Sequence, residues 1–176
     1  MAIKKAVQIG DPVIRKVAKK VTDPQSRATQ KIVKDLVDSM RSAGLVGMAA
    51  PQIGKGSRIF VVELRKTKAR RDLEASPLYI FINPQIISYS KKQVVGYEGC
   101  GSIAFGQLFG PVRRPQSVVV RALDGTGIPF TLSAKGVLAR VIQHEHDHLN
   151  GIVFLDKITD MQKLVSRDYF IKHKPK

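Results

Sequence analysis

The sequence predicts an α+β fold, in which short and mainly antiparallel β-sheets pack around a central α-helix that carries the motif H-E-H-D-H at 144–148. Short apolar runs bounded by turn residues fill the middle of the chain, as expected of strands. From Ser133 to Leu149 the apolar residues recur at helical spacing instead. The length of 176 residues suits one domain, 1–176, with 165–176 expected as a loosely ordered basic tail.

The first long helix is predicted to begin at Asp23-Pro24, because Asp caps helices and Pro favours their first turn. It is predicted to end near Gly44. The apolar residues of this helix recur at three- and four-residue spacing: Ile32, Leu36, Val37 and Met40. The next segment, 45–52, is expected to be irregular, since it is rich in small residues and contains Pro51.

Buried strands are predicted where short apolar runs occur, at 59–62, 79–82 and 118–123. The second strand is expected to stop at Asn83-Pro84. The third should turn at Asp124-Gly125 and pair with 130–132 as a hairpin. The central helix follows from Ser133 and ends at Asn150-Gly151. A weak helix is expected after Asp156.

The chain is strongly basic, with 30 Lys and Arg against 14 Asp and Glu and a net charge of +16. Residues 1–71 hold 17 of these cations and 5 of the acids. Such a charge suggests a polyanionic partner without establishing one. Five cations crowd into 65–71, which is expected to be a surface loop, either solvated or in contact with phosphate.

A single cysteine excludes an internal disulfide framework. The N-terminus lacks the long apolar run of a secretory signal, and no apolar stretch is long enough to span a membrane. We therefore expect a cytoplasmic protein of bacterial type, or an organellar one if the source is eukaryotic, with no membrane partner.

The motif H-E-x-x-H at 144–148 indicates a metal-binding, catalytic site. His144 and His148 lie one helical turn apart on one face and can grip one metal ion, and Glu145 is placed to reach the attacking water. His146 is expected to face solvent. Asp147 is expected to support a ligand or to lie at the surface.

A catalytic metal site needs a third protein ligand. Residue 154, where one peptidase pattern places a third histidine, is Phe, and no Glu follows Glu145 as thermolysin-like peptidases require. The downstream aspartates Asp156, Asp160 and Asp168 and the upstream thiol of Cys100 remain as alternatives. A thiolate with two imidazoles suits Fe(II), Zn, Co or Ni.

Three motifs in order resemble those of the peptide deformylases. Leu45 to Gln52 is similar to the family motif G-x-G-x-A-A-x-Q, Glu98 to Ser102 to E-G-C-x-S, and Gln143 to Gly151 to Q-H-E-x-D-H-x-x-G. The resemblance covers nearly the whole chain. It implies a hydrolase that removes the formyl group from the initiator methionine of nascent polypeptides and releases formate.

The resemblance also implies a role for each matching residue. Cys100, His144 and His148 would bind one divalent metal ion, most often Fe(II), with Zn, Ni or Co tolerated. Glu145 would transfer the proton from water to the leaving amine. The Gln52 amide and the Gly101 N–H would hold the oxyanion. The expected substrate-binding residues are main-chain groups of the first two motifs and pocket walls on the helix: Val46, Gly47, Gly99, Val137, Arg140 and Val141.

Two positions depart from the family motifs. Leu45 stands where the first motif begins with Gly, and Gly101 stands where bacterial enzymes usually carry Leu after the cysteine. The stretch 106–114 and Arg140 resemble an organelle-type or divergent branch, so a shift in acyl or peptide specificity is one alternative. A peptidase sharing H-E-x-x-H, and a basic RNA- or ribosome-binding protein of reduced activity, are the others.

Overall fold

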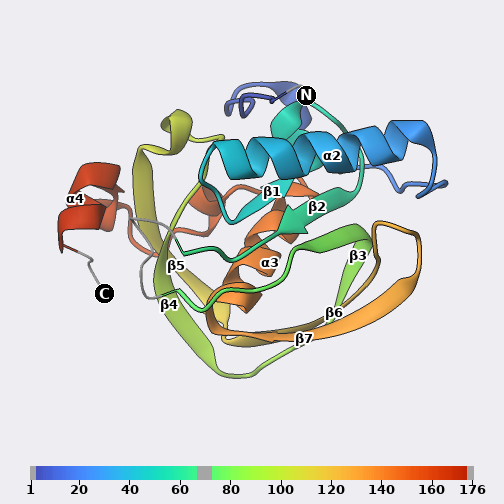
Figure 1. The fold of residues 1–176 in the computed structure, drawn as a ribbon. Helices are drawn as coiled ribbons and strands as arrows, with labels where there is room; N and C mark the ends of the chain where they lie inside the picture. The colour runs from blue at the N-terminus through green and yellow to red at the C-terminus, as the bar shows by residue number, and fades with distance from the viewer. Residues whose placement is uncertain (1–2, 67–72, 174–176) are drawn as a thin grey trace.

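The computed structural model describes residues 3–66 and 73–173 and confirms the α+β architecture. Two antiparallel sheets lie on either side of one central helix (Figure 1). The helices are α1 (Pro12–Arg15), α2 (Arg27–Ser42), α3 (Gly136–His148) and α4 (Arg167–His173). The strands are β1 (Gly47–Ala49), β2 (Ile59–Val62), β3 (Tyr79–Tyr89), β4 (Gln93–Gly99), β5 (Leu108–Pro115), β6 (Ser117–Leu123), β7 (Pro129–Lys135) and β8 (Val165–Ser166).

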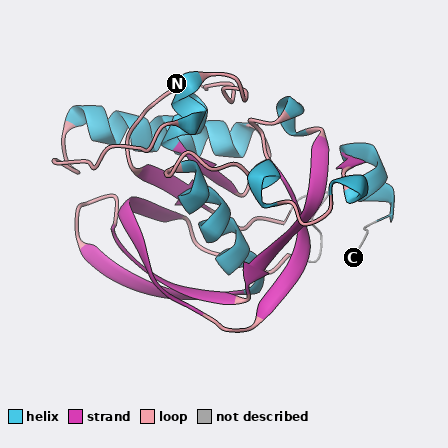
Figure 2. Ribbon diagram, turned by 180° about the vertical axis from the view of Figure 1, so that it is seen from behind, coloured by secondary structure: helices cyan, strands magenta, loops and turns pink. Residues whose placement is uncertain are grey.

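The larger sheet has the order β1-β2-β3-β6-β7, and the smaller has the order β4-β5-β8. Helix α3 contacts strands of both sheets, whereas α2 covers β1 and β2 from the other side (Figure 2). β2 is buried along its whole length because it lies between these two helices: Phe60 and Val62 pack in the α3 cluster, and Ile59 and Val61 in the α2 cluster. The continuous apolar run at 59–62 predicts a buried strand, as a strand covered on both faces requires.

Helix α2 begins three residues later than predicted. Ser26 is the N-cap and accepts a hydrogen bond from the Thr29 N–H, while the Asp23 carboxylate accepts bonds from the Gln25 and Ser26 N–H groups in the turn before it. Both residues are good caps, and Asp23 is used to close a turn instead of the helix. The predicted end near Gly44 is confirmed, since the helix stops at Ser42.

The prediction that the second strand stops at Asn83-Pro84 is wrong. β3 continues to Tyr89 through a bulge, where Asn83 adopts a left-handed φ of 52° and the pairing with β6 shifts between Ile82 and Gln85. A bulge tolerates a proline because the extra residue needs no ladder hydrogen bond. The Asn83 side chain fixes the bulge by bonding the main chain of Val21.

The predicted hairpin is confirmed, with Ala122 paired to Phe130 across the turn at Asp124-Gly125. The central helix, however, begins at Gly136 and not at Ser133, because β7 runs on to Lys135 opposite Ser117. Gly136 has a φ of 57°, a conformation that favours glycine, and this residue turns the strand into the helix.

The C-terminal segment, expected to be a loosely ordered tail, forms β8 and α4 as far as His173. Val165 pairs with Phe109 on β5, and the Phe170 ring stacks on the Phe109 ring with centroids 4.5 Å apart. Residues 174–176 and most of the basic run 65–71 lie outside the described residues. Among the helices that are described, none is long and apolar enough to cross a membrane.

Candidate metal centre

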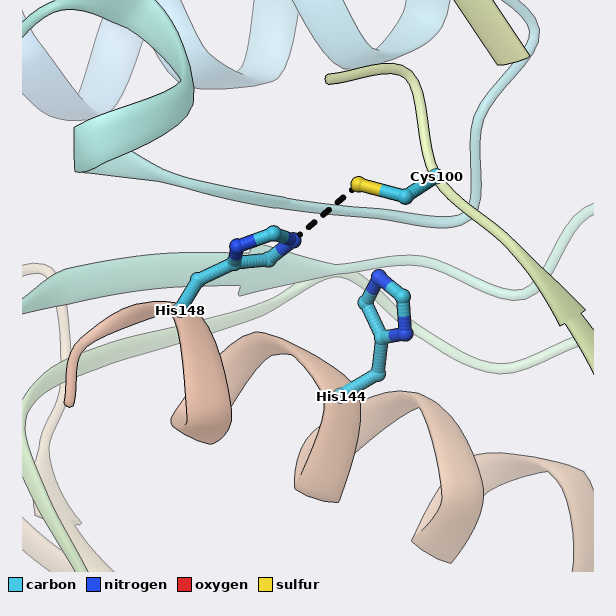
Figure 3. Close-up of side chains that lie close together, drawn as sticks. All are labelled: Cys100, His144 and His148. Atoms are coloured by element: carbon cyan, nitrogen blue, oxygen red, sulfur yellow. Dashed lines mark hydrogen bonds between the residues drawn. The ribbon is translucent and has the colours of Figure 1, made fainter. Parts of the chain in front are cut away.

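Helix α3 brings His144 and His148 to the middle of the molecule, with their ring centroids 5.0 Å apart on one face (Figure 3). Cys100 follows directly after β4 and points at the same space. Its Sγ lies 3.2 Å from the Nε2 atom of His148, and the donor atoms of all three residues lie within 4.8 Å of one another. Of the third ligands that the sequence left open, Cys100 is therefore the one that the structure places next to the histidine pair.

These three donors fit a divalent metal ion. Ligands bound at roughly 2.0–2.3 Å around a tetrahedral metal lie about 3.3–3.6 Å from one another, close to the Cys100–His148 separation. Cys100 is 4% exposed and His148 is fully buried, so three protein ligands can enclose the ion and leave a fourth position for water or substrate. A thiolate and two imidazoles form a donor set that Fe, Zn, Ni and Co accept.

Cys100 is prepared to bind as a thiolate. Burial opposes ionisation of the thiol, but the charges and hydrogen bonds of His148 and His144 lower the pKa of Cys100 well below its usual value. The Ser102 N–H and the Gln52 side-chain amide also donate to Sγ, each at 3.4 Å. These two donors stabilise the charged sulfur that a metal requires.

A buried ionic network orients the first histidine. The Glu98 carboxylate lies 2.9 Å from Nδ1 of His144, which leaves Nε2 of that ring free for the ion. Arg114 binds both Glu98 oxygens and also Asp147, and Lys157 binds the other oxygen of Asp147. Burial opposes the charge on Glu98, but Arg114 and His144 hold the pKa of this carboxyl well below its usual range.

Glu145 is a buried carboxyl next to the histidine pair. Its side chain is buried, and Oε2 has no hydrogen-bond partner among the described residues. Burial raises the pKa of Glu145 to about 7, a value at which a carboxyl both takes and gives a proton near neutral pH. Gly47 packs directly against it, since a Cβ added at Gly47 would lie 2.5 Å from Oε1 of Glu145.

Gln52 lies beside Cys100, one of the three candidate metal ligands. The short helix Ala50–Ile53 buries the residue, and the Ala49 N–H donates to its Oε1 at 2.8 Å. This bond turns the amide NH₂ group toward the Cys100 sulfur. Gly101 lies next to Cys100 in the loop after β4, where its carbonyl accepts from the Gln8 side chain at 2.8 Å.

Two open sheet edges flank the centre, since β1 and β4 each end the order of their sheet. The Val46 carbonyl already accepts from the Glu63 N–H on the β2 side. Because antiparallel strands alternate the direction of their polar groups, Gly47 presents its N–H and C=O to the open edge. Gly99 is the last residue of β4 and lies opposite Phe109 of β5. Both edges offer main-chain groups to an extended peptide.

The three predicted pocket residues differ in what they can offer. Val137 is 50% exposed in the first turn of α3, and Val141 packs against Gly47. The Arg140 guanidinium donates to Glu98 and to the carbonyls of Val94, Gly96 and Val112. It therefore packs on the face of the smaller sheet at Gly96, between β4 and β5, and anchors these two strands to α3.

The remaining sequence candidates lie away from the centre. The three aspartates kept as alternative ligands have other roles: Asp156 pairs with Arg15, Asp160 caps a short turn of helix, and Asp168 lies in the first turn of α4. His146 was expected to face solvent but is half-buried between Arg58 and Asn150. Burial, with the charge of Arg58, lowers the pKa of His146 to about 4, so this ring is neutral at pH 7.

Sequence reasoning assigned no role to Glu98 or Arg114, although both support the metal centre. The one available signal was the acidic residue two positions before the only cysteine, because metal-binding histidines commonly donate to a carboxylate. Arg114 gave no comparable signal. Its role depends on the pairing of β5 with β4, which brings it beside Glu98 and Asp147.

Comparison with known proteins gives a consistent result. Residues 3–164 match the family model described as polypeptide deformylase. A peptide deformylase of Natranaerobius thermophilus is 38% identical over 161 residues, which is 92% of this chain and 96% of the relative. A peptide deformylase of Brucella suis is 37% identical over 174 residues, covering 98% of this chain and 91% of the relative.

Solved structures agree with the sequence relatives. A class I type b peptide deformylase of Acinetobacter baumannii with bound Met-Ala-Ser matches with a TM-score of 0.84 at 28% identity, covering 89% of this chain and 99% of that one. A peptide deformylase of Ehrlichia chaffeensis in complex with actinonin matches with a TM-score of 0.81 at 32% identity, covering 98% of this chain and 95% of that one.

Proposed function

The chain belongs to the peptide deformylase family, and we propose that its residues 1–176 form one catalytic domain that hydrolyses the formyl group from the initiator methionine of nascent polypeptides. The products are formate and a peptide with a free amino group. The observation that carries this proposal is the meeting of Cys100, His144 and His148 beside the buried carboxyl of Glu145.

The metal is divalent, and we propose Fe(II) as the native ion, with Zn, Ni or Co as substitutes that the same donors accept. When bound, it supplies a Lewis acid that polarises the formyl carbonyl and makes water a stronger acid. Cys100, His144 and His148 hold it, and Glu98 fixes the orientation of the His144 ring.

The protein residues move the proton and hold the developing charge. The Glu145 carboxylate takes the proton from the water that attacks the formyl carbon and then gives it to the nitrogen of the leaving amine. The Gln52 NH₂ group and the Gly101 N–H donate to the oxygen that becomes negatively charged. The pre-set orientation of the Gln52 amide supports this role, since an oriented donor needs no reorganisation during the reaction.

We propose that the peptide binds in an extended form along the open edge of β1, with Gly47 and Gly99 offering main-chain contacts. Val46, whose carbonyl is bonded to the Glu63 N–H, would contribute through its own N–H. The Acinetobacter relative solved with Met-Ala-Ser supports a substrate that begins with methionine. Val137, Val141 and the stem of Arg140 would border the first side chain. The bonds that hold Arg140 to β4 favour a wall that does not move when peptide binds.

A formate assay tests this function. The protein loaded with Fe(II) under anaerobic conditions, or with Ni(II), should release one formate and one Met-Ala-Ser peptide from each formyl-Met-Ala-Ser, measured by enzymatic formate detection and mass spectrometry. Acetyl-Met-Ala-Ser serves as the matched control and should react at least about a hundredfold more slowly. Cleavage at internal peptide bonds, or no formate from either metal form, would refute the proposal.

We also propose that the enzyme works in the cytoplasm, close to the ribosome, and uses its basic surface to stay there. Support comes from a groove of about 650 Å³ between α1 and the start of α2, lined by Lys16, Lys19 and Lys20. None of these three lysines forms an ion pair with a described residue. Cations without partners on a concave surface suit the phosphates of ribosomal RNA.

Replacing Lys16, Lys19 and Lys20 with glutamate should remove cosedimentation with ribosomes at about 100 mM salt. The fall of log affinity with log salt should become less steep, its slope decreasing in magnitude by about 2. The matched control, Lys91→Glu with Lys92→Glu and Lys172→Glu, removes three exposed lysines outside the groove. Formate release from the short peptide should stay unchanged in both. If the two triple variants bind ribosomes equally, the groove is not the contact.

A further inference from the structure

Gly101 lacks a side chain for a reason other than its backbone conformation. Its φ does not lie in the left-handed region, so other residues could adopt the same conformation. The space beside it is restricted instead, because a Cβ added there would lie 3.3 Å from Cδ1 of Leu45 and 3.5 Å from Cβ of Ala6. A Cβ at residue 101 would require the Leu45 methyl group to shift by a few tenths of an ångström, and a larger side chain there would compete with Leu45 for the same space.

The backbone of Leu45 is held at both ends. Its N–H donates to the Met40 carbonyl at the end of α2, and its carbonyl accepts from the Arg65 guanidinium at 2.9 Å. The side chain packs partly into the apolar cluster under α2 and reaches Gly101 from there. A residue anchored in this way gives the loop after Cys100 a fixed surface to rest on.

The loop after Cys100 is tied at several points, and one of them is the Cys100–Gly101 peptide unit itself, whose C=O accepts from the Ile103 N–H at 3.0 Å. Its outer side is held by the Gln8 amide on the Gly101 carbonyl and by the Ile9 N–H on the Ser102 carbonyl. The Gly101 N–H belongs to the preceding peptide unit, between Cys100 and Gly101. Leu45 packs beside Gly101, and its Cδ1 is the heavy atom nearest to a Cβ added there, so this side chain limits how far the peptide unit can tilt.

We propose that Leu45 is a positioning residue for the Gly101 N–H, and that positions 45 and 101 form one packing unit in which only one of the two carries a large side chain. These are also the two positions at which the sequence departs from the family motifs. The two departures together thus move one large side chain from position 101 to position 45, on the other side of the same contact. The inference rests on the proposed role of the Gly101 N–H in holding the oxyanion.

A double-mutant cycle tests the exchange. Leu45→Gly should uncover the loop, and Gly101→Leu should overfill it, so each alone should lower kcat for formate release by about tenfold with little change in KM. The double variant should return to within about threefold of the original kcat, because the leucine is present again on the other side of the contact. Metal content should stay at one ion per chain in all four proteins.

Gly56→Leu is the matched control. Gly56 has an ordinary φ and no atom within 4 Å of an added Cβ, so the substitution should leave kcat unchanged and should not restore the Leu45→Gly variant. If Gly101→Leu does not fold, Gly101→Ala with Leu45→Ala forms a milder cycle, since alanine requires a shift of only a few tenths of an ångström.

The thermal midpoint Tm, measured in the same four proteins, does not depend on activity. A Tm of the double variant above that expected from the sum of the single losses supports the packing unit, even if the wild-type chain released no formate and the proposed function failed. Losses of both kcat and Tm that simply add in the double variant would overturn the inference.

Discussion

Replacing Glu145 with glutamine is expected to lower kcat for formate release by about a thousandfold, because the amide can neither take the proton from water nor give it to the leaving amine. The ion should stay bound, since Glu145 lies outside the ligand group formed by Cys100, His144 and His148. KM should change little. Steady-state kinetics and metal analysis of the same preparation measure both quantities.

The same substitution should leave folding stability equal or higher. Glu145 is buried and its Oε2 has no partner among the described residues, so a neutral amide of the same size removes the cost of a buried charge. Glu74→Gln, at an exposed position, is the matched control and should keep full activity. Activity of the Glu145→Gln variant near the wild-type level would exclude Glu145 as the proton carrier.

Replacing Cys100 with serine is expected to weaken metal binding by at least about a hundredfold, more than the loss of a residue that merely supports a ligand. A hydroxyl of the same shape stays protonated and is a harder donor than the thiolate, whose pKa is lowered by His148 and His144. Activity should fall with the bound metal. Elemental analysis after desalting, followed by the formate assay, measures the two losses together.

Cobalt gives an independent readout of the same ligand. The Co(II)-loaded protein should show a thiolate-to-metal charge-transfer band in the near ultraviolet, and Cys100→Ser should lack it. His173→Ser removes an exposed histidine of α4 and should keep both the metal and the band. Retention of metal, band and activity in the Cys100→Ser variant would show that the sulfur is not a ligand.

The sequence predicted the parts of the fold whose pattern is local. The apolar run at Ile59–Val62 and the turn at Asp124-Gly125 each indicate an element directly, and the structure has both. β4 and β5 were not predicted, because their inner face carries Glu98 and Arg114 where an ordinary strand would carry apolar residues. These charged side chains are buried only because they pair with each other and with α3.

The three candidate metal ligands could be predicted from the sequence, but the residues that orient and pack around them could not. The spacing of His144 and His148 depends on one helix, and the only thiol in the chain is Cys100, so both are visible in the sequence. The contact between Leu45 and Gly101 joins residues 56 positions apart in sequence and depends on how β1 packs beside the loop after β4. Contacts of this kind can be identified only once the fold is known.

The most direct test of the account is a titration of the metal-free protein with Fe(II) under anaerobic conditions, with formate release from formyl-Met-Ala-Ser measured at each step. The rate should rise in proportion to the added metal and stop rising at one equivalent per chain, because one group of three ligands holds the ion. Formate release without metal, or none at one equivalent, would contradict the account.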